Sequence, residues 1–87
     1  MIPPTKVAFS VRVNGKLAEE IGTSRLSVEV TEPAIIQDIL DQMISMFPGT
    51  SRIINQAIPF LGGNHSGVNE KIRSGQEITL LMPAAGG

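Results

Sequence analysis

The sequence contains no cysteine, which excludes disulfide bonds, thiol catalysis, iron–sulfur ligation and thiolate metal sites. Tryptophan and tyrosine are also absent, and the only aromatic residues are three phenylalanines. Isoleucine, leucine, valine and methionine must therefore fill any core. The single histidine, His65, cannot build a metal site by itself. We expect the chain to bind neither a metal nor a cofactor.

Neither sign of charge dominates, since seven basic residues stand against eight acidic ones for a net charge of -1. The basic residues form no stripe, which argues against nucleic acid as a partner. No apolar run reaches the roughly 18 residues that a membrane helix needs. The first residues also lack the charged segment and apolar stretch of a secretion signal. These absences predict a cytoplasmic protein that acts away from membranes.

The composition that remains is that of an ordinary globular protein, with 41% hydrophobic and 17% charged residues. A chain of 87 residues is long enough for one small core and too short for two. We expect one domain over residues 1–82, followed by a flexible tail over residues 83–87.

Two amphipathic strands are expected in the first third of the chain. Residues 6–13 and 24–30 both alternate apolar and polar side chains, and such strands commonly pair antiparallel. Asn14-Gly15 is a turn signal that favours positive φ angles. A direct hairpin and a short helix over residues 16–21 both fit the segment between the strands.

A longer helix is expected from Pro33 to Phe47. Proline is common in the first turn of a helix, and Thr31 or Glu32 is placed to cap it. Pro48-Gly49 marks its end. An apolar stripe at spacings of three and four predicts that one side of this helix packs on a sheet; its members are Ile36, Ile39, Leu40, Met43 and Phe47.

The second half of the chain is typical of two further strands. Residues 53–61 are apolar and β-branched, and Pro59 indicates a sheet edge, a bulge or a strand end. Residues 62–67 are rich in glycine but lack the Gly-Lys-Ser/Thr ending of a phosphate loop, so we expect a solvated connection with His65 exposed. Residues 77–82 form the last strand.

The predicted order is strand, strand, helix, strand, strand. It favours an α+β protein with a mixed four- to five-stranded sheet and one main helix packed on one face. With the first and last strands side by side in the centre, this is the β-grasp, or ubiquitin-like, fold.

The end of the sequence has a character that packing does not require. Pro83 cannot donate a ladder hydrogen bond and helps to end the strand, and the small residues Ala84, Ala85, Gly86 and Gly87 follow it. A terminal glycine has no Cβ to shield its carbonyl carbon from a nucleophile. We therefore expect the Gly87 carboxylate to be the reactive group, activated by a partner that uses ATP.

The last strand also carries two large apolar residues in succession. By alternation Leu80 faces the core and Leu81 the opposite side, so we expect Leu81 to be partly exposed within a docking patch. The chain contains no constellation of nucleophile and base. It is thus expected to be a carrier or a non-catalytic subunit and not an enzyme.

These residues resemble the ubiquitin-like sulfur carriers, especially the small subunit of molybdopterin synthase and, more loosely, the thiamin-pathway sulfur carrier. The stretch over residues 74–87 is similar to that family's acidic-glycine turn, final strand, proline and terminal diglycine. Asn55-Gln56-Ala57-Ile58 is similar to its third-strand motif, and Lys6-Val7-Ala8-Phe9 to its opening strand.

The resemblance implies a mechanism carried out with partners. An activating enzyme related to ubiquitin E1, an E1-like adenylyltransferase that itself binds ATP and Mg²⁺, would adenylate Gly87. Sulfur from a persulfide would then displace AMP to leave a thiocarboxylate. The tail over residues 83–87 would enter the molybdopterin synthase large subunit and deliver the sulfur there for molybdenum cofactor synthesis.

The resemblance also implies which residues bind the partners. Ile58 and Leu81 match the family's hydrophobic contacts, and Phe60 and Met82 complete the expected partner-binding set. Ser10 stands where the family often has a bulky aromatic residue, and Met82 replaces the first of two prolines. A divergent carrier and an archaeal-type modifier joined to lysines of target proteins both remain compatible with this pattern.

Overall fold

The computed structural model describes residues 5–83. Five strands form one mixed sheet in the order β2-β1-β7-β4-β5, and β3 and β6 form a separate two-stranded sheet. In chain order the elements are β1 (Thr5–Val13), α1 (Gly15–Ile21), β2 (Arg25–Glu32), β3 (Ala34–Ile35), α2 (Ile36–Met46), α3 (Ser51–Ile54), β4 (Ile58–Leu61), β5 (Asn64–His65), β6 (Lys71–Ile72) and β7 (Glu77–Leu81).

The first and last strands lie side by side in the centre of the sheet, as expected. β1 runs parallel to β7, with Val11 opposite Ile78. β2 pairs with the other edge of β1 and β4 with the other edge of β7, both antiparallel. Because β7 is hydrogen-bonded on both edges, the last strand of the chain is also one of its most firmly held.

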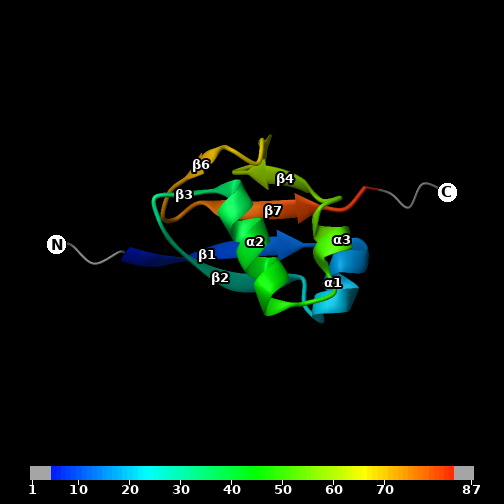
Figure 1. The fold of residues 1–87 in the computed structure, drawn as a ribbon. Helices are drawn as coiled ribbons and strands as arrows, with labels where there is room; N and C mark the ends of the chain where they lie inside the picture. Colours follow the sequence, from blue (N-terminus) through cyan, green and yellow to red (C-terminus); the bar gives the residue numbers. More distant parts are fainter. Residues whose placement is uncertain (1–4, 84–87) are drawn as a thin grey trace.

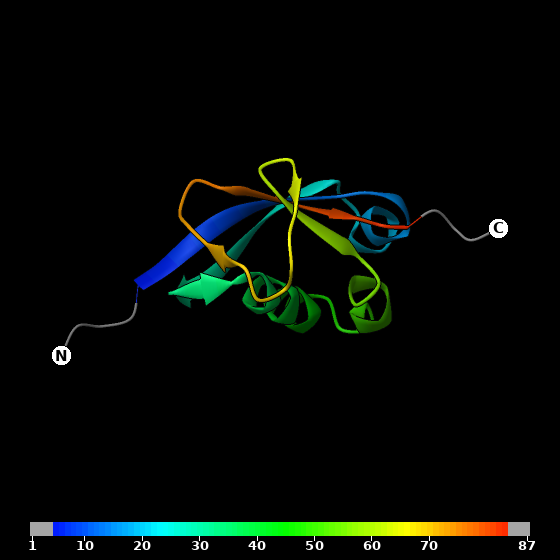
Figure 2. The same cartoon turned by 90° about the horizontal axis from the view of Figure 1, so that it is seen from above.

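α2 crosses one face of this sheet, and α1 and α3 lie at the end where β1 and β7 finish (Figure 1). Figure 2 shows α2 and α3 together on one side of the sheet. Four members of the predicted stripe, Ile36, Ile39, Leu40 and Met43, are buried there with the alternate residues of the strands, which confirms the helical periodicity. Phe47, the fifth, follows the helix as its C-cap residue and is half-buried. The fully buried large side chains are Phe9, Leu17, Ile36, Ile39, Met43, Ile54, Ile78, Leu80, Val11 and Val28.

The start of α2 differs from the sequence-based expectation. Pro33 lies outside the helix, which begins only at Ile36, and neither Thr31 nor Glu32 caps it. The preceding residues form β3 instead and pair with β6. The Asp38 carboxylate accepts a hydrogen bond of 2.8 Å from the Ile35 N–H, which satisfies one of the free donors at the helix start.

The open choice after β1 is settled in favour of the short helix. α1 follows Asn14 directly and buries Leu17. Gly22 closes it in a left-handed conformation with φ 93°, and its N–H donates to the Ala18 carbonyl at 2.8 Å. A simple hairpin between β1 and β2 is therefore wrong, although the two strands do pair antiparallel.

The apolar run over residues 53–61 is only partly a strand. Its first residues belong to the single-turn helix α3, and only Ile58–Leu61 is extended. Pro59 is paired opposite Leu80, and its carbonyl accepts from the Ser66 N–H at 2.9 Å, on the side of β4 away from β7. The missing proline N–H therefore points to that outer side, where it removes no bond to β7.

The glycine-rich connection is short and largely exposed, as predicted, but it contains the two-residue strand β5. His65 is exposed, and Ser66 is buried. Within residues 5–83, no cluster of three histidine, aspartate or glutamate side chains is arranged to hold a metal ion. None of the helices in that part of the chain is long and apolar enough to cross a membrane.

Candidate functional site at the end of the central strand

The outer face of β7 ends in an exposed apolar pair. Leu81 is 37% exposed, whereas its neighbours on the inner face, Ile78 and Leu80, are fully buried, which confirms the alternation predicted from the sequence. Ile58 lies directly opposite Leu81 on β4 and is also 37% exposed. Two large apolar side chains are thus brought together from residues 23 positions apart along the chain.

Phe60 extends this pair toward β5. It is half-buried on the same face of β4 as Ile58 and pairs with His65 of β5. The rings of Phe60 and His65 meet edge to face, with centroids 5.6 Å apart and planes at 89°. The apolar patch, defined as Ile58, Phe60 and Leu81, therefore has a polar aromatic border that the sequence did not reveal.

Charged groups lie on the other side of the apolar patch. Arg12 is paired opposite Thr79 of β7, which in turn is opposite Phe60, so a guanidinium and the patch share one row across the sheet. Arg25 is paired opposite Arg12 on β2, and its Nη2 lies 3.9 Å from the Glu77 Oε2. The outer face is consequently apolar over β4 and the end of β7, and carries Arg12 and Arg25 where β1 and β2 pair beside it.

Ser10 of β1 is a further polar residue on the outer face. Its Oγ lies 3.4 Å from the Glu77 Oε2, a long hydrogen bond. The position at which the sulfur carriers often have a bulky aromatic residue is thus occupied here by a hydroxyl that faces a carboxylate. A partner would meet a flatter, more polar surface at this point than an aromatic residue provides.

The chain leaves the sheet through an anchored residue. The Met82 N–H donates to the Asn14 Oδ1 at 2.9 Å, and the Met82 side chain packs against the core. Gly15, whose φ of 56° favours glycine, would bring a Cβ within 3.5 Å of the Met82 Cβ. Pro83, the next residue, is exposed. The chain therefore passes from a fixed residue, Met82, directly to an exposed one, Pro83.

A shallow cavity of about 570 Å³ lies at this exit. Its lining includes polar side chains of α1 and the side chains of both residues that follow β7. The lining residues are Asn14, Gly15, Lys16, Glu19, Ile53, Gln56, Met82 and Pro83. The cavity thus surrounds the root of the tail, and a partner that grips the tail would contact α1 as well.

The structure brings together some of the predicted site residues. Ile58, Phe60 and Leu81 share the outer face, while Met82 is half-buried at the sheet end and serves as an anchor. Asn14 was expected only as a turn residue; its link to Met82 spans 68 positions, which no local pattern reveals. The predicted reactive residue Gly87 and the tail positions Ala84, Ala85 and Gly86 lie outside the described residues.

The shape of the chain matches several solved structures. Small archaeal modifier protein 1 (SAMP1) of Haloferax volcanii superposes with a TM-score of 0.81 at 24% identity, over 92% of this chain and 99% of that one. The fold is the ubiquitin-like β-grasp. The expectation from the sequence is therefore confirmed at the level of the fold, including the mixed sheet and the helix packed on one of its faces.

Two further β-grasp neighbours come from complexes. A chain of the complex of subunits 1 and 2 of molybdopterin-converting factor from Helicobacter pylori has a TM-score of 0.62 at 19% identity, covering 95% of this chain and 100% of that one. A chain of the BexX/CysO complex of Amycolatopsis orientalis has a TM-score of 0.72 at 18% identity, covering 92% and 100%. Comparison of the sequence with protein-family models and with curated proteins finds no match.

Proposed function

We propose that this β-grasp protein is a sulfur carrier whose Gly87 carboxylate is converted to a thiocarboxylate for molybdopterin synthesis. The observation that carries the proposal is the exit of the chain from the sheet. β7 is held on both edges, Met82 is tied to Asn14, and Pro83 then reaches the surface. A tail of small residues attached to so firm a root suits delivery of a terminal group into a partner's active site.

The chemistry of the proposal needs a partner for each step. The Gly87 carboxylate attacks the α-phosphorus of ATP on an E1-like enzyme, which forms an acyl-adenylate and releases pyrophosphate. The terminal sulfur of a persulfide then attacks the acyl carbon and displaces AMP, and a second thiol cleaves the resulting acyl disulfide to leave the thiocarboxylate. Such a carrier acts in the cytoplasm, where ATP is available.

In this scheme residues 5–83 provide the surface that binds the partners and take no part in the chemical steps. We assign the apolar patch of Ile58, Phe60 and Leu81 to the contact with the activating enzyme and with the synthase large subunit. Exposed apolar side chains grouped on one face are typical of such contacts. The molybdopterin-converting factor complex of Helicobacter pylori, in which a similar chain is assembled with a second subunit, supports the assignment.

The direct test is adenylation of the full chain. With an E1-like adenylyltransferase, ATP and Mg²⁺, the protein should release pyrophosphate in a single turnover. A chain without Gly86 and Gly87 should release none. A matched control that replaces the exposed Val68 with alanine should release as much as the unchanged protein, since it leaves the tail and the apolar patch intact. Equal release from the truncated and full chains would contradict the proposal.

A second candidate is a modifier joined through Gly87 to lysines of other proteins. The neighbour SAMP1, described as a small archaeal modifier protein, favours it, and both functions begin with the same acyl-adenylate. Peptides bearing Gly-Gly on lysine, found in digests of cells that express the chain and lost without Gly87, would support this use. If they are absent and thiocarboxylate is present, the carrier function alone stands.

A further inference from the structure

The outer edge of β2 is the longest strand edge in the described part of the chain that no other strand covers. β2 has eight residues and lies at one end of the sheet, beyond β1. The Val13 N–H donates to the Ser24 carbonyl at 2.9 Å, which fixes the phase of the ladder between the two strands. Since bonding alternates along a strand, Ser27, Glu29 and Thr31 direct their N–H and C=O groups away from β1.

The side chain of Thr23 agrees with this alternation of hydrogen bonds, and it occupies the outward backbone groups at one end of the edge. Its Oγ1 donates to the Arg25 carbonyl at 3.0 Å and accepts from the Arg25 N–H at 3.3 Å. Both backbone groups of Arg25 therefore point to the outer edge, as the alternation requires, and both are already satisfied. Within residues 5–83 no backbone hydrogen bond is made to the outward groups of Ser27, Glu29 or Thr31.

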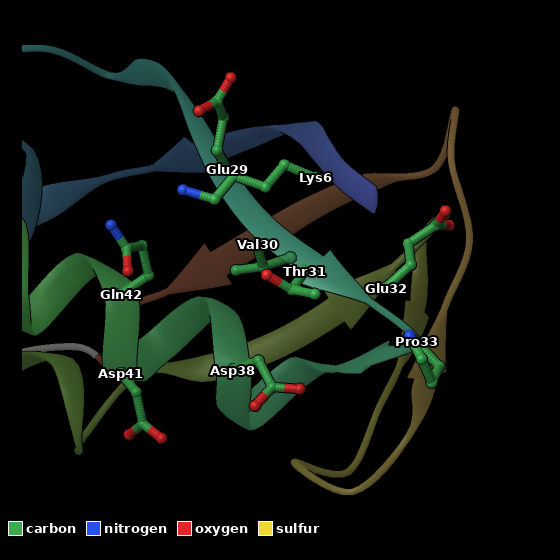
Figure 3. A pocket seen from close by; sticks show the side chains of 9 residues that line it. All are labelled: Lys6, Glu29, Val30, Thr31, Glu32, Pro33, Asp38, Asp41 and Gln42. Carbon is green, nitrogen blue, oxygen red and sulfur yellow. The ribbon is translucent and has the colours of Figure 1, made fainter. Parts of the chain in front are cut away.

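A groove follows the open part of this edge. It has a volume of about 670 Å³ and runs between β2 and the flank of α2, with four carboxylates and one ammonium group in its lining, a formal charge of -3. Figure 3 shows Glu29 on one side of β2 and Asp38 and Asp41, from α2, on the other. Glu32 lies at the end of the strand and Lys6 beside Glu29.

We propose that this groove binds an extended, basic segment of a partner protein, which pairs with β2 as an additional strand. The open N–H and C=O groups supply the backbone bonds of strand addition. Carboxylates on both sides of the edge supply the charge that complements lysine or arginine on the added strand. Because a strand turns alternate side chains to opposite sides, basic residues on either side of it meet an acidic group.

A second copy of this chain does not fit the same edge. Antiparallel pairing of two β2 strands about Glu29 would place the two Glu29 carboxylates opposite each other, and like charges directly opposite are unfavourable in a sheet. The acidic groove therefore disfavours pairing of the protein with itself while it attracts a basic strand. Charge on an exposed edge is a common protection against such pairing.

This binding is independent of the proposed carrier role. The groove includes Lys6, near the start of β1, and Pro33, which follows the end of β2. Figure 1 shows that this end of the two strands is opposite to α1, beside which the tail begins. The apolar patch lies on β4 and β7, across β1 from β2. A partner could hold the groove while another enzyme works at the tail.

The test uses the full chain labelled with ¹⁵N and a capped hexapeptide of alternating lysine and valine. The amide signals of Ser27, Glu29 and Thr31 should shift to saturation, and their hydrogen exchange should slow. A glutamate–valine hexapeptide is the matched control and should bind at least about tenfold more weakly at low salt. The difference should shrink in 1 M salt, where charges are screened beyond about 3 Å.

Two variants separate the contribution of the backbone hydrogen bonds to binding from the contribution of the charge. Ser27→Pro removes an outward N–H without touching the ladder to β1, and should weaken lysine–valine binding at least about fivefold. Ser27→Ala keeps the N–H and should bind as the unchanged protein. Glu29→Gln keeps the backbone and removes one carboxylate, and should weaken binding about two- to fivefold at low salt.

Three results would overturn the proposal. The two hexapeptides could bind equally, the shifts could fall on Ile58 and Leu81 instead of β2, or the β2 amides could shift with protein concentration before any peptide is added. The last result would identify a second copy as the occupant. Should Ser27→Pro fail to fold, the peptide comparison and Glu29→Gln still decide the question. Adenylation of Gly87 is measured separately, so its failure leaves these outcomes unaffected.

Discussion

The two faces of β7 show how one strand serves both stability and recognition. On the inner face Ile78 and Leu80 are completely buried in the core, whereas on the outer face Leu81 stays more than a third exposed beside Ile58. The side chains are chemically alike, so the difference lies in what covers them. Burial of a leucine stabilises the fold, and exposure of a leucine leaves its transfer free energy available to a partner.

The largest expected effect is on the free energy of unfolding, to which the inner face should contribute far more than the outer face. Leu80→Ala should lower the free energy of unfolding by about 2–5 kcal/mol, because it opens a cavity in the core. Leu81→Ala is the matched control on the other face and should cost less than about 1 kcal/mol. Urea denaturation of both variants measures the difference. Equal losses would mean that the outer face is covered after all.

The second effect concerns binding, for which the outer face should matter more than the inner face. Leu81→Glu should leave the unfolding midpoint nearly unchanged but weaken binding to the activating enzyme about tenfold or more, since it places a charge in an apolar contact. Titration calorimetry gives the affinity. The exposed Val68 lies outside the apolar patch, so Val68→Glu serves as the control. A Leu81→Glu protein that still binds with full affinity would remove the apolar patch from the docking surface.

A smaller effect is expected at the root of the tail. Asn14→Ala removes the acceptor for the Met82 N–H and should cost about 0.5–1.5 kcal/mol. Asn14→Asp retains an acceptor oxygen and should recover most of that loss. Backbone NMR relaxation should also show Met82 and Pro83 more mobile in the alanine variant. Unchanged relaxation would show that the anchor depends on the packing of Met82 alone.

The smallest effect is expected at the charged border of the outer face. Arg25 and Glu77 are 3.9 Å apart, and both side chains are well exposed, so solvent screens their attraction. Arg25→Ala should change the free energy of unfolding by less than about 0.5 kcal/mol. Thermal unfolding at low and at high salt checks this. A loss several times larger would show that the ion pair between Arg25 and Glu77 is part of the scaffold.

The elements that were predicted well are those whose pattern is set by burial on one side. The alternation in β1 and β7 and the stripe of α2 follow from the core that they share, and these patterns lie within the segments themselves. The exposed Leu81 could be predicted for the same reason. It breaks the alternation of a strand that has only one covered face.

The elements that were predicted wrongly depend on partners distant in the sequence. Pro33 suits a helix start by local preference, but pairing of β3 with β6 keeps that segment extended, and Asp38 caps the helix further on. Ile53 and Ile54 have strand-like side chains yet lie in α3, where Ile54 completes the core. The Asn14–Met82 bond and the open edge of β2 likewise arise from topology.

The chemical fate of Gly87 decides whether the protein is a sulfur carrier. Intact-mass spectrometry of the full chain, recovered from cells that also express an E1-like enzyme and a persulfide donor, tests it directly. We predict a species whose mass corresponds to sulfur in place of one terminal oxygen, and its loss when Gly87 is deleted. A chain recovered only as the unmodified carboxylate under these conditions would contradict the account.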